Sequence, residues 1–327
     1  VFHLELCGEE SELSKQIKWT CDGKIAKIRD YSQGECNIYN SVLVSVMSEG
    51  AGYVIAELDG VEYRAEIIAS EMIKDSGEYE YYLADLHTHT ATEHDHKRFM
   101  LHEDQKIEDY LDSISGDNLL DLAIISDHAI TTNDYDFVRG FKLVEEIKKP
   151  IMLAGAESEI AFVETDRFGI PHKHSGEIVT LMSANRINTD SYSEFEEKIS
   201  ESLSPVAIFA HPCTVGFSTK GVWNFDFGNH NTDAMKYIAC GIEMGSGADA
   251  KENILHEYAI SSALDAGFKL STTCSSDCHG PIYGGNLIPG KTVILASERS
   301  KEGFHEALRA RRFYATESGD VKLKYSV

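Results

Sequence analysis

From residue 81 onward, short apolar runs alternate with longer stretches in which apolar residues recur at helical spacing. This alternation is typical of β-strands joined by helices that cross over a largely parallel sheet. Since seven or eight such units follow one another, the pattern predicts a closed or distorted barrel rather than an open sheet. The expected strands are 82–86, 122–126, 151–156, 177–183, 206–210, 241–244, 269–273 and 291–296. The expected helices include 103–115, 135–148, 193–203, 253–266 and 301–311.

The first 80 residues follow a different pattern. Runs at 41–47, 52–58 and 62–69 alternate apolar with polar residues, and Asp59-Gly60 between two of them is a hairpin signal. We therefore expect a small, mostly β domain over residues 1–80, whose role the sequence does not reveal. The barrel is expected over 81–318, and residues 319–327 would form a C-terminal strand or tail.

The charge of the chain restricts its partners. The 327 residues include 54 acidic and 30 basic side chains, for a net charge of −24. Such a surface repels polyanions, so duplex nucleic acid and anionic membranes are not expected as partners. A small anionic substrate remains compatible, because a bound metal ion inverts the local field. No apolar run is long enough for a membrane-spanning helix.

Seven cysteines at irregular spacing suit reduced thiols better than a disulfide framework. This usage predicts a cytoplasmic protein. Secretion stays open as an alternative, because the given sequence starts with Val1 rather than Met.

Nearly every expected barrel strand ends in, or lies beside, histidine or carboxylate side chains. In a parallel barrel those strand ends meet at one face. One such residue alone is more simply a surface or helix-capping group, but that explanation would have to apply at seven segments. The residues in question are His87, His89, Asp127, His128, Glu157, His172, His174, Glu177, His211, Glu243, Asp277 and His279.

The spacing of these residues suits metal chemistry. His87 and His89 are two apart, so on an extended strand both imidazoles point to the same side, as a borderline ion such as Zn²⁺, Mn²⁺ or Fe²⁺ prefers. Glu157 offers two oxygens that could bridge two ions. Clustered cations can activate a water and clamp both oxygens of a displacement at phosphorus. The sequence therefore predicts a metal-dependent hydrolase.

Five short motifs, in order, carry a resemblance to a known family. They are ADLHTHT, IISDH, GAES, FAHP and SSDCHG. Their combination resembles the PHP (polymerase and histidinol phosphatase) family over residues 82–318. Within that family the chain looks closest to predicted phosphoesterases and carbaryl-hydrolase-like enzymes, whose ending the segment 309–316 resembles.

The resemblance implies a distorted (β/α)7 barrel that holds two or three divalent ions (Zn, Mn or Fe). His87, His89, Glu157 and Asp277 would surround one ion. Glu157, a fourth-strand histidine and His211 would hold another. Glu157 would bridge and, with Asp277, act in catalysis through a metal-bound hydroxide. A third ion would take His128, His279 and a residue of the first loop.

The chain departs from the family pattern in two places. Where the family shows Ser-Asp-Gly, this sequence has Glu93 followed by His94, Asp95 and His96. His94 stands at the aspartate position, and Asp95 or His96 are alternatives.

The fourth-strand histidine is the second departure. His174 lies three residues before the expected strand, while Glu177 sits nearer the family position. We expect His174 as the ligand, with Glu177 or His172 as alternates.

Three further interpretations concern neighbouring residues. Glu243 would either orient a ligand histidine through its other ring nitrogen or be a simple capped carboxylate. Cys278 lies between two expected ligands and should be a buried thiol that points away from them. Arg98 and Lys173 lie nearest the metal motifs and are the best candidates for binding a phosphate group.

The sequence thus predicts a phosphoesterase that hydrolyses a small phosphate ester. A carboxyl or carbamate ester hydrolase with the same site is the main alternative, because the first loop is altered. A non-catalytic metal-binding domain that docks a partner is a third hypothesis. Neither the substrate, the native metal nor the oligomeric state follows from the sequence.

Overall fold

The computed structural model describes most of the chain. The described residues are 2–3, 15–28, 41–42, 44–69, 77–90, 107–115, 120–165, 168–169, 171–183, 185–189, 191–212, 227–228, 230–245, 250–279, 290–317 and 321–323.

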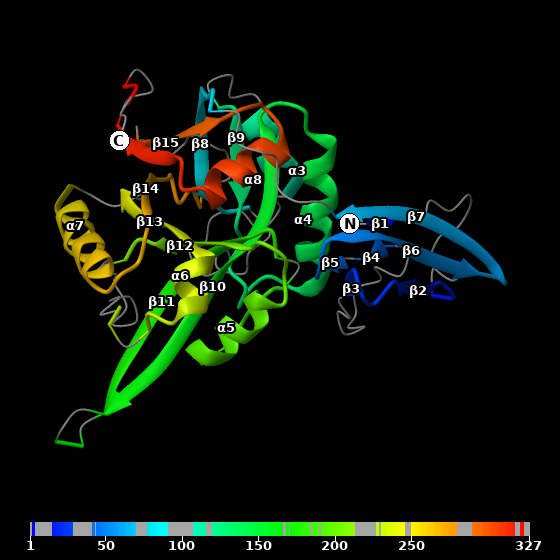
Figure 1. Ribbon diagram of the computed structural model, residues 1–327, viewed down its shortest axis with the longest axis horizontal. Coiled ribbons are helices and arrows are strands. Elements are labelled where there is room, and N and C mark those ends of the chain that lie inside the picture. Colours follow the sequence, from blue (N-terminus) through cyan, green and yellow to red (C-terminus); the bar gives the residue numbers. More distant parts are fainter. Residues whose placement is uncertain are drawn as a thin grey trace.

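Nine strands form one sheet in the order β14-β13-β12-β11-β10-β9-β8-β15-β16. The sheet curls until its two edges approach (Figure 1), where the Ala315 amide donates to Thr272 Oγ1 at 3.3 Å. The result is a nearly closed, barrel-like sheet, as the alternation of strands and helices predicts. Its strands are β8 (Glu80–Thr88), β9 (Leu122–Ile125), β10 (Ile151–Thr165), β11 (Pro171–Leu181), β12 (Val206–Ala210), β13 (Ala239–Gly245), β14 (Ser271–Cys274), β15 (Lys291–Ala296) and β16 (Phe313–Thr316).

Strand direction corrects the expectation of a largely parallel sheet. The pairs β8–β9, β9–β10, β12–β13 and β13–β14 are parallel. In contrast, β11 is antiparallel to both neighbours, and β15 is antiparallel to β8 and β16. The physical reason at β11 is a direct hairpin from β10, with no crossover helix to return the chain to the other end of the sheet.

The β10–β11 hairpin is also longer than expected. It runs to Thr165 on one side and restarts at Pro171 on the other, and its far end projects away from the barrel (Figure 1). Gly169, with a φ of 78°, lies between the two strands in a conformation that favours glycine.

Within the described residues, six helices lie between these strands. Four begin at a capping residue whose side chain accepts a hydrogen bond from a backbone N–H three residues later: Asn133, Ser191, Thr232 and Ser300. The short α6 was not expected, because six residues give too little periodicity to recognise. The helices are α3 (Ile107–Ser115), α4 (Asp134–Glu146), α5 (Tyr192–Ser200), α6 (Asp233–Ile238), α7 (Ala250–Asp265) and α8 (Lys301–Arg309).

The apolar core has an inner and an outer part. The inner cluster takes residues from strands all around the sheet, such as Leu86, Ile124 and Val179, and Phe304 of α8 packs into it. The outer clusters fill the space between the sheet and the helices that cover it. Burial of these side chains is the main favourable contribution to the fold.

The strands before residue 80 belong to small antiparallel sheets of their own, which lie to one side of the barrel (Figure 1). Asp59 and Gly60 both adopt positive φ between β6 and β7, as the hairpin signal predicts. The Leu203 amide donates to the Val46 carbonyl at 2.9 Å and so ties these sheets to the barrel. The strands are β1 (Phe2–His3), β2 (Lys18–Cys21), β3 (Ala26–Ile28), β4 (Ser41–Val42), β5 (Val44–Val46), β6 (Gly50–Leu58) and β7 (Val61–Ala69).

Within the described residues, every helix is too short or too polar to cross a lipid bilayer.

Close packing of β10 against β11 yields a stability prediction. A Cβ atom on Gly155 would lie 2.2 Å from the Thr180 carbonyl oxygen, which belongs to the backbone and cannot turn aside. We expect Gly155→Ala to lower the free energy of unfolding by about 2 kcal/mol or more through overpacking. Gly23→Ala is the matched control, because its added Cβ meets nothing within 4 Å. Urea unfolding of both variants tests this, and equal midpoints would contradict it.

Candidate metal centre

Eight histidine and carboxylate side chains converge at one end of the barrel and form what we call the His/carboxylate cluster. They fall into overlapping groups of three whose ligand atoms lie within 4.8 Å of one another. Seven of the eight are residues that the sequence predicts as metal ligands, and the eighth, Glu177, was an alternate. The members are His87, His89, His128, Glu157, Glu177, His211, Asp277 and His279.

A bulge in β8 directs the first two histidines into the cluster. Asp85 pairs with Ala123 and Thr88 pairs with Ile125, so β8 has one more residue than β9 between these pairs. Ala123 and Ile125 belong to an outer core cluster, whereas Leu86 belongs to the inner one. The extra residue therefore shifts the alternation after Leu86, and His87 and His89 both face inward.

Glu157 is the centre of the cluster. Its carboxylate is fully buried. Oε1 lies 3.2 Å from His87 Nε2 and 3.1 Å from His211 Nε2. Oε2 lies 3.0 Å from His128 Nδ1 and 3.4 Å from His89 Nε2. One carboxylate thus touches four imidazoles, two on each oxygen, which is the arrangement that a bridge between two cations requires.

Asp277 contacts the first two histidines as well. Its Oδ1 is 3.1 Å from His89 Nε2, 3.5 Å from His87 Nε2 and 3.4 Å from His279 Nδ1. The Nε2 atoms of His87 and His89 are themselves only 2.9 Å apart. His87, His89, Glu157 and Asp277 therefore enclose one small volume.

Three further contacts complete the cluster. His279 Nε2 lies 3.4 Å from His128 Nε2. Glu177 places Oε2 at 3.5 Å from His211 Nε2 and Oε1 at 4.0 Å from His128 Nδ1. Glu177 is opposite Ala210, the last residue of β12, so the middle of an antiparallel strand reaches the same level as the ends of the parallel ones.

The chemistry of the cluster fits divalent metal ions. Glu157 Oε2 and Asp277 Oδ1 are buried, and although imidazole nitrogens lie 3.0 and 3.1 Å from them, neither oxygen accepts a hydrogen bond of regular geometry within the described residues. Buried anionic oxygens of this kind need a positive partner. Imidazole nitrogens mixed with carboxylate oxygens are a donor set that suits Zn²⁺, Mn²⁺ or Fe²⁺.

The pKa shifts within the cluster also fit a site for cations. Burial by itself raises the pKa of Glu157, but His87 and His128 outweigh it and hold the pKa well below its usual range. Burial lowers the pKa of His211, yet the carboxylates of Glu157 and Glu177 raise it to about 10. Burial and the neighbouring Glu157 raise the pKa of Glu177 to about 7. Without metal, protons on His211 and Glu177 therefore supply positive charge or neutralise negative charge within the cluster, a role that bound metal ions would take over.

Two members of the cluster have strained backbones. His211 has a φ of 23° and Asp277 a φ of 46°, both in the left-handed region that non-glycine residues rarely adopt. The His211 N–H donates to Glu243 Oε2 at 2.7 Å, and the Asp277 N–H donates to the His87 carbonyl at 3.0 Å. Strain that the surrounding structure maintains in this way is characteristic of functional sites.

Several predicted residues take other positions. Asp127 accepts hydrogen bonds from the N–H and the hydroxyl of Thr90, at 2.6 and 2.7 Å, so it anchors the chain just after His89. Glu243 contacts His87 and His211 from outside the cluster. Cys278 is fully buried in an outer core cluster, as expected.

The remaining candidates are the residues at the start of β11 and those of the first loop. His174 pairs with Phe162, three residues farther along the hairpin than Glu177. The backbone of His172, Lys173 and His174 belongs to β11, but their side chains lie outside the described part of the chain. The candidates in the first loop lie entirely outside the described part of the chain: His94, Asp95, His96 and Arg98.

Asp85 is an anchoring residue beside the cluster that the sequence analysis did not single out. It is fully buried, and its Oδ1 accepts the Ser276 N–H at 3.0 Å. Lys291 Nζ lies 3.4 Å from Oδ2 and supplies a counter-charge. Asp85 thereby anchors the segment that carries Asp277. An acidic residue within an apolar strand, two positions before His87, was the available signal.

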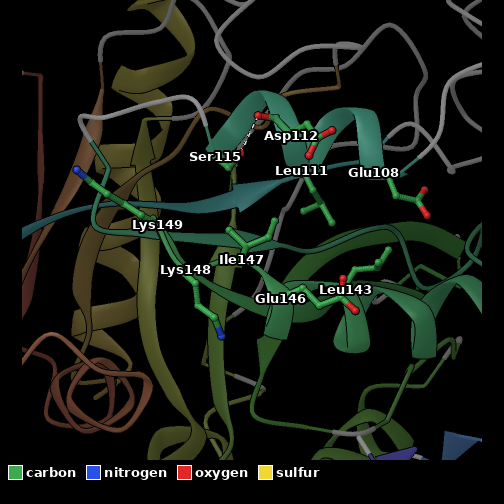
Figure 2. Close-up of a pocket in the computed structure, with 9 residues that line it drawn as sticks. All are labelled: Glu108, Leu111, Asp112, Ser115, Leu143, Glu146, Ile147, Lys148 and Lys149. Atoms are coloured by element: carbon green, nitrogen blue, oxygen red, sulfur yellow. Dashed lines mark hydrogen bonds between the residues drawn. The ribbon is translucent and has the colours of Figure 1, made fainter. Parts of the chain in front are cut away.

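A separate pocket lies on the outside of the barrel, between α3 and the end of α4. Its volume is about 340 Å³. Figure 2 shows Leu111 of α3 pointing toward Leu143 and Ile147, with carboxylates around them. This pocket shares no residue with the His/carboxylate cluster.

Comparison with known proteins gives one distant structural likeness. No protein-family model and no curated protein matches the chain. The chain is similar to a crystal structure from Bacteroides vulgatus of a two-domain protein containing a predicted PHP-like metal-dependent phosphoesterase. The similarity has 20% identity, covers 76% of this chain and 68% of the other, and has a TM-score of 0.47.

Metal binding should release protons from the cluster. His211 has a pKa of about 10 without metal, so its imidazole is protonated at pH 7, and the nearby carboxylates also raise the pKa of His87. A metal must displace such protons, so we expect apparent affinity to increase about tenfold per pH unit for each proton released. Calorimetric Zn²⁺ titrations between pH 6 and 8, in buffers of different ionisation enthalpy, measure the release. Affinity independent of pH would contradict this prediction.

Proposed function

We propose that this protein is a metal-dependent hydrolase of the phosphoesterase type, acting on a small phosphate ester at a site for two or three divalent ions. The observation that supports it is the carboxylate of Glu157, buried and in contact with four imidazoles at 3.0–3.4 Å. Bound divalent ions would make a water nucleophilic at neutral pH and neutralise charge on the reacting phosphoryl group.

The side chains of the cluster divide this work among them. Glu157 and Asp277 would hold adjacent cations together, because each presents its oxygens to histidines from different strands. The five histidines supply neutral ligands and fix the positions of the ions. Glu177, whose pKa is raised to about 7, is able to hold or accept a proton beside His211 and His128. His87, His89 and Glu157 are fully buried, which keeps bulk water away from this part of the cluster.

Several nearby ions favour chemistry at phosphorus over a binding role alone. Adjacent cations clamp the attacking and leaving oxygens of an in-line displacement. The overlapping groups His87–His89–Glu157 and His128–Glu157–Glu177 share Glu157, so two ions would lie side by side. The same site is also suited to attack on a carboxyl or carbamate ester, which makes that class the alternative to test.

A variant that lacks the charge of Glu157 should bind at least one metal ion fewer than the wild type. Glu157→Gln keeps the shape of the side chain but cannot bridge two cations. Wild-type protein should contain about two or three equivalents of Zn, Mn or Fe, and the variant at least one fewer, by elemental mass spectrometry. Glu306→Gln is the control, because Glu306 of α8 is also buried but pairs with Arg312 and is not a member of the cluster. Wild-type protein that stays free of metal after reconstitution would refute the proposal.

Activity separates the two substrate classes. We expect metal-loaded wild-type protein to hydrolyse aryl phosphates within a panel of phosphate mono- and diesters, and Glu157→Gln to lose at least about 100-fold in kcat/KM. Turnover of aryl carboxyl esters without turnover of phosphates would favour the alternative. Inactivity on both panels by a metal-containing protein would favour a non-catalytic domain.

A further inference from the structure

We propose that Glu243 is a positioning residue that holds two histidines of the metal site, His87 and His211, in their binding orientations. The inference rests on the proposed metal site and deepens it, because Glu243 would act on the metal through these two histidines. Its evidence is the placement of its two carboxylate oxygens, each on a different histidine.

Glu243 is a fully buried carboxylate in the middle of β13. Burying such a group is costly unless both oxygens are satisfied. Oε1 lies 2.9 Å from His87 Nδ1, and Oε2 accepts the His211 N–H at 2.7 Å. The residue therefore links β13 to β8 and to the end of β12.

The contact with His87 fixes which ring nitrogen carries the proton. A carboxylate oxygen accepts hydrogen bonds, so a neutral, metal-binding His87 would carry its single proton on Nδ1. This leaves the Nε2 lone pair free, and Nε2 is the atom that faces His89 at 2.9 Å and Glu157 at 3.2 Å. A hydrogen bond to the distal nitrogen of this kind orients a metal-ligating imidazole and raises its basicity.

The contact with His211 acts on the backbone instead. His211 follows directly after β12 and has a φ of 23°. Its N–H is held by Glu243 while its Nε2 lies 3.1 Å from Glu157 Oε1. The rings of His87 and His211 are stacked, with centroids 5.5 Å apart and planes 24° apart. One carboxylate thus sets the relative position of two stacked rings.

Glutamine in place of Glu243 is a specific test, because its amide oxygen accepts hydrogen bonds whereas its NH₂ group only donates them. The backbone N–H of His211 cannot change its role, so the amide oxygen of Glu243→Gln should face it. The amide NH₂ would then face His87 Nδ1 and require a lone pair there. His87 would carry its proton on Nε2, where the metal has to bind.

The test compares zinc affinity, by competition with a chelator at fixed pH, in wild type and three variants. We expect Glu243→Gln to weaken the affinity for at least one ion about 10- to 100-fold. Glu243→Asp keeps the charge but is one methylene shorter, so it should recover part of the loss. Glu306→Gln removes a buried carboxylate far from the cluster and should bind zinc like wild type.

A spectroscopic readout excludes a merely structural role. In zinc-loaded protein labelled with ¹⁵N-histidine, His87 should show a protonated Nδ1, assigned by its loss in His87→Asn. Glu243→Gln should remove that signal while the thermal midpoint of the metal-free protein stays close to that of Glu306→Gln. If Glu243→Gln does not fold, the wild-type spectrum alone decides, since an unprotonated His87 Nδ1 would overturn the inference.

The outcomes separate this inference from the proposed function. Wild-type zinc binding together with unchanged affinity and an unchanged His87 signal in Glu243→Gln would overturn the role of Glu243 alone. Absence of zinc binding in wild-type protein would overturn both.

Discussion

The buried carboxylate of Glu157 is the constraint on which the rest of the site depends. A fully buried carboxylate is very unfavourable without positive partners, and here four imidazoles approach it, two from the end of β8 and one each from the segments after β9 and β12. Those imidazoles can satisfy Glu157 either as protonated cations or as ligands that share it with metal ions. The barrel must bring the strand ends together for either state, so the fold and the site impose the same requirement.

A second set of acidic groups lies outside the cluster and holds it in place. Asp85 anchors the segment before Asp277, Asp127 anchors Thr90 after His89, and Glu243 spans His87 and His211. Asp85 and Asp127 each accept a backbone N–H from a residue next to a cluster member, and Glu243 accepts the backbone N–H of a cluster member, His211. This explains how the strained backbones at His211 and Asp277 persist, because fixed hydrogen bonds offset the cost of their positive φ.

Much of the site was predictable because it follows the period of the strands. His87 and His89 share a side at a spacing of two, and His211 and Asp277 directly follow or closely trail apolar runs, so their meeting at one face follows from a barrel. The curled sheet and five of the six helices in the described part of the chain were likewise predictable from the alternation of strands and helices. The β8 bulge was not, since an extra residue leaves no mark on an apolar pattern until the neighbouring strand is known.

Strand direction shows where sequence reasoning must fail, and Glu177 shows the consequence. Short apolar runs look alike whether a strand enters or leaves the site, and the hairpin between β10 and β11 has no crossover helix that would reveal the reversal. Because β11 runs against its neighbours, it reaches the cluster through its middle, where Glu177 is opposite Ala210. Searching near the start of that strand favoured His174, which pairs with Phe162 toward the turn. A carboxylate at the Glu177 position adds negative charge beside Glu157 and Asp277, and that charge strengthens the electrostatic demand for cations in the cluster.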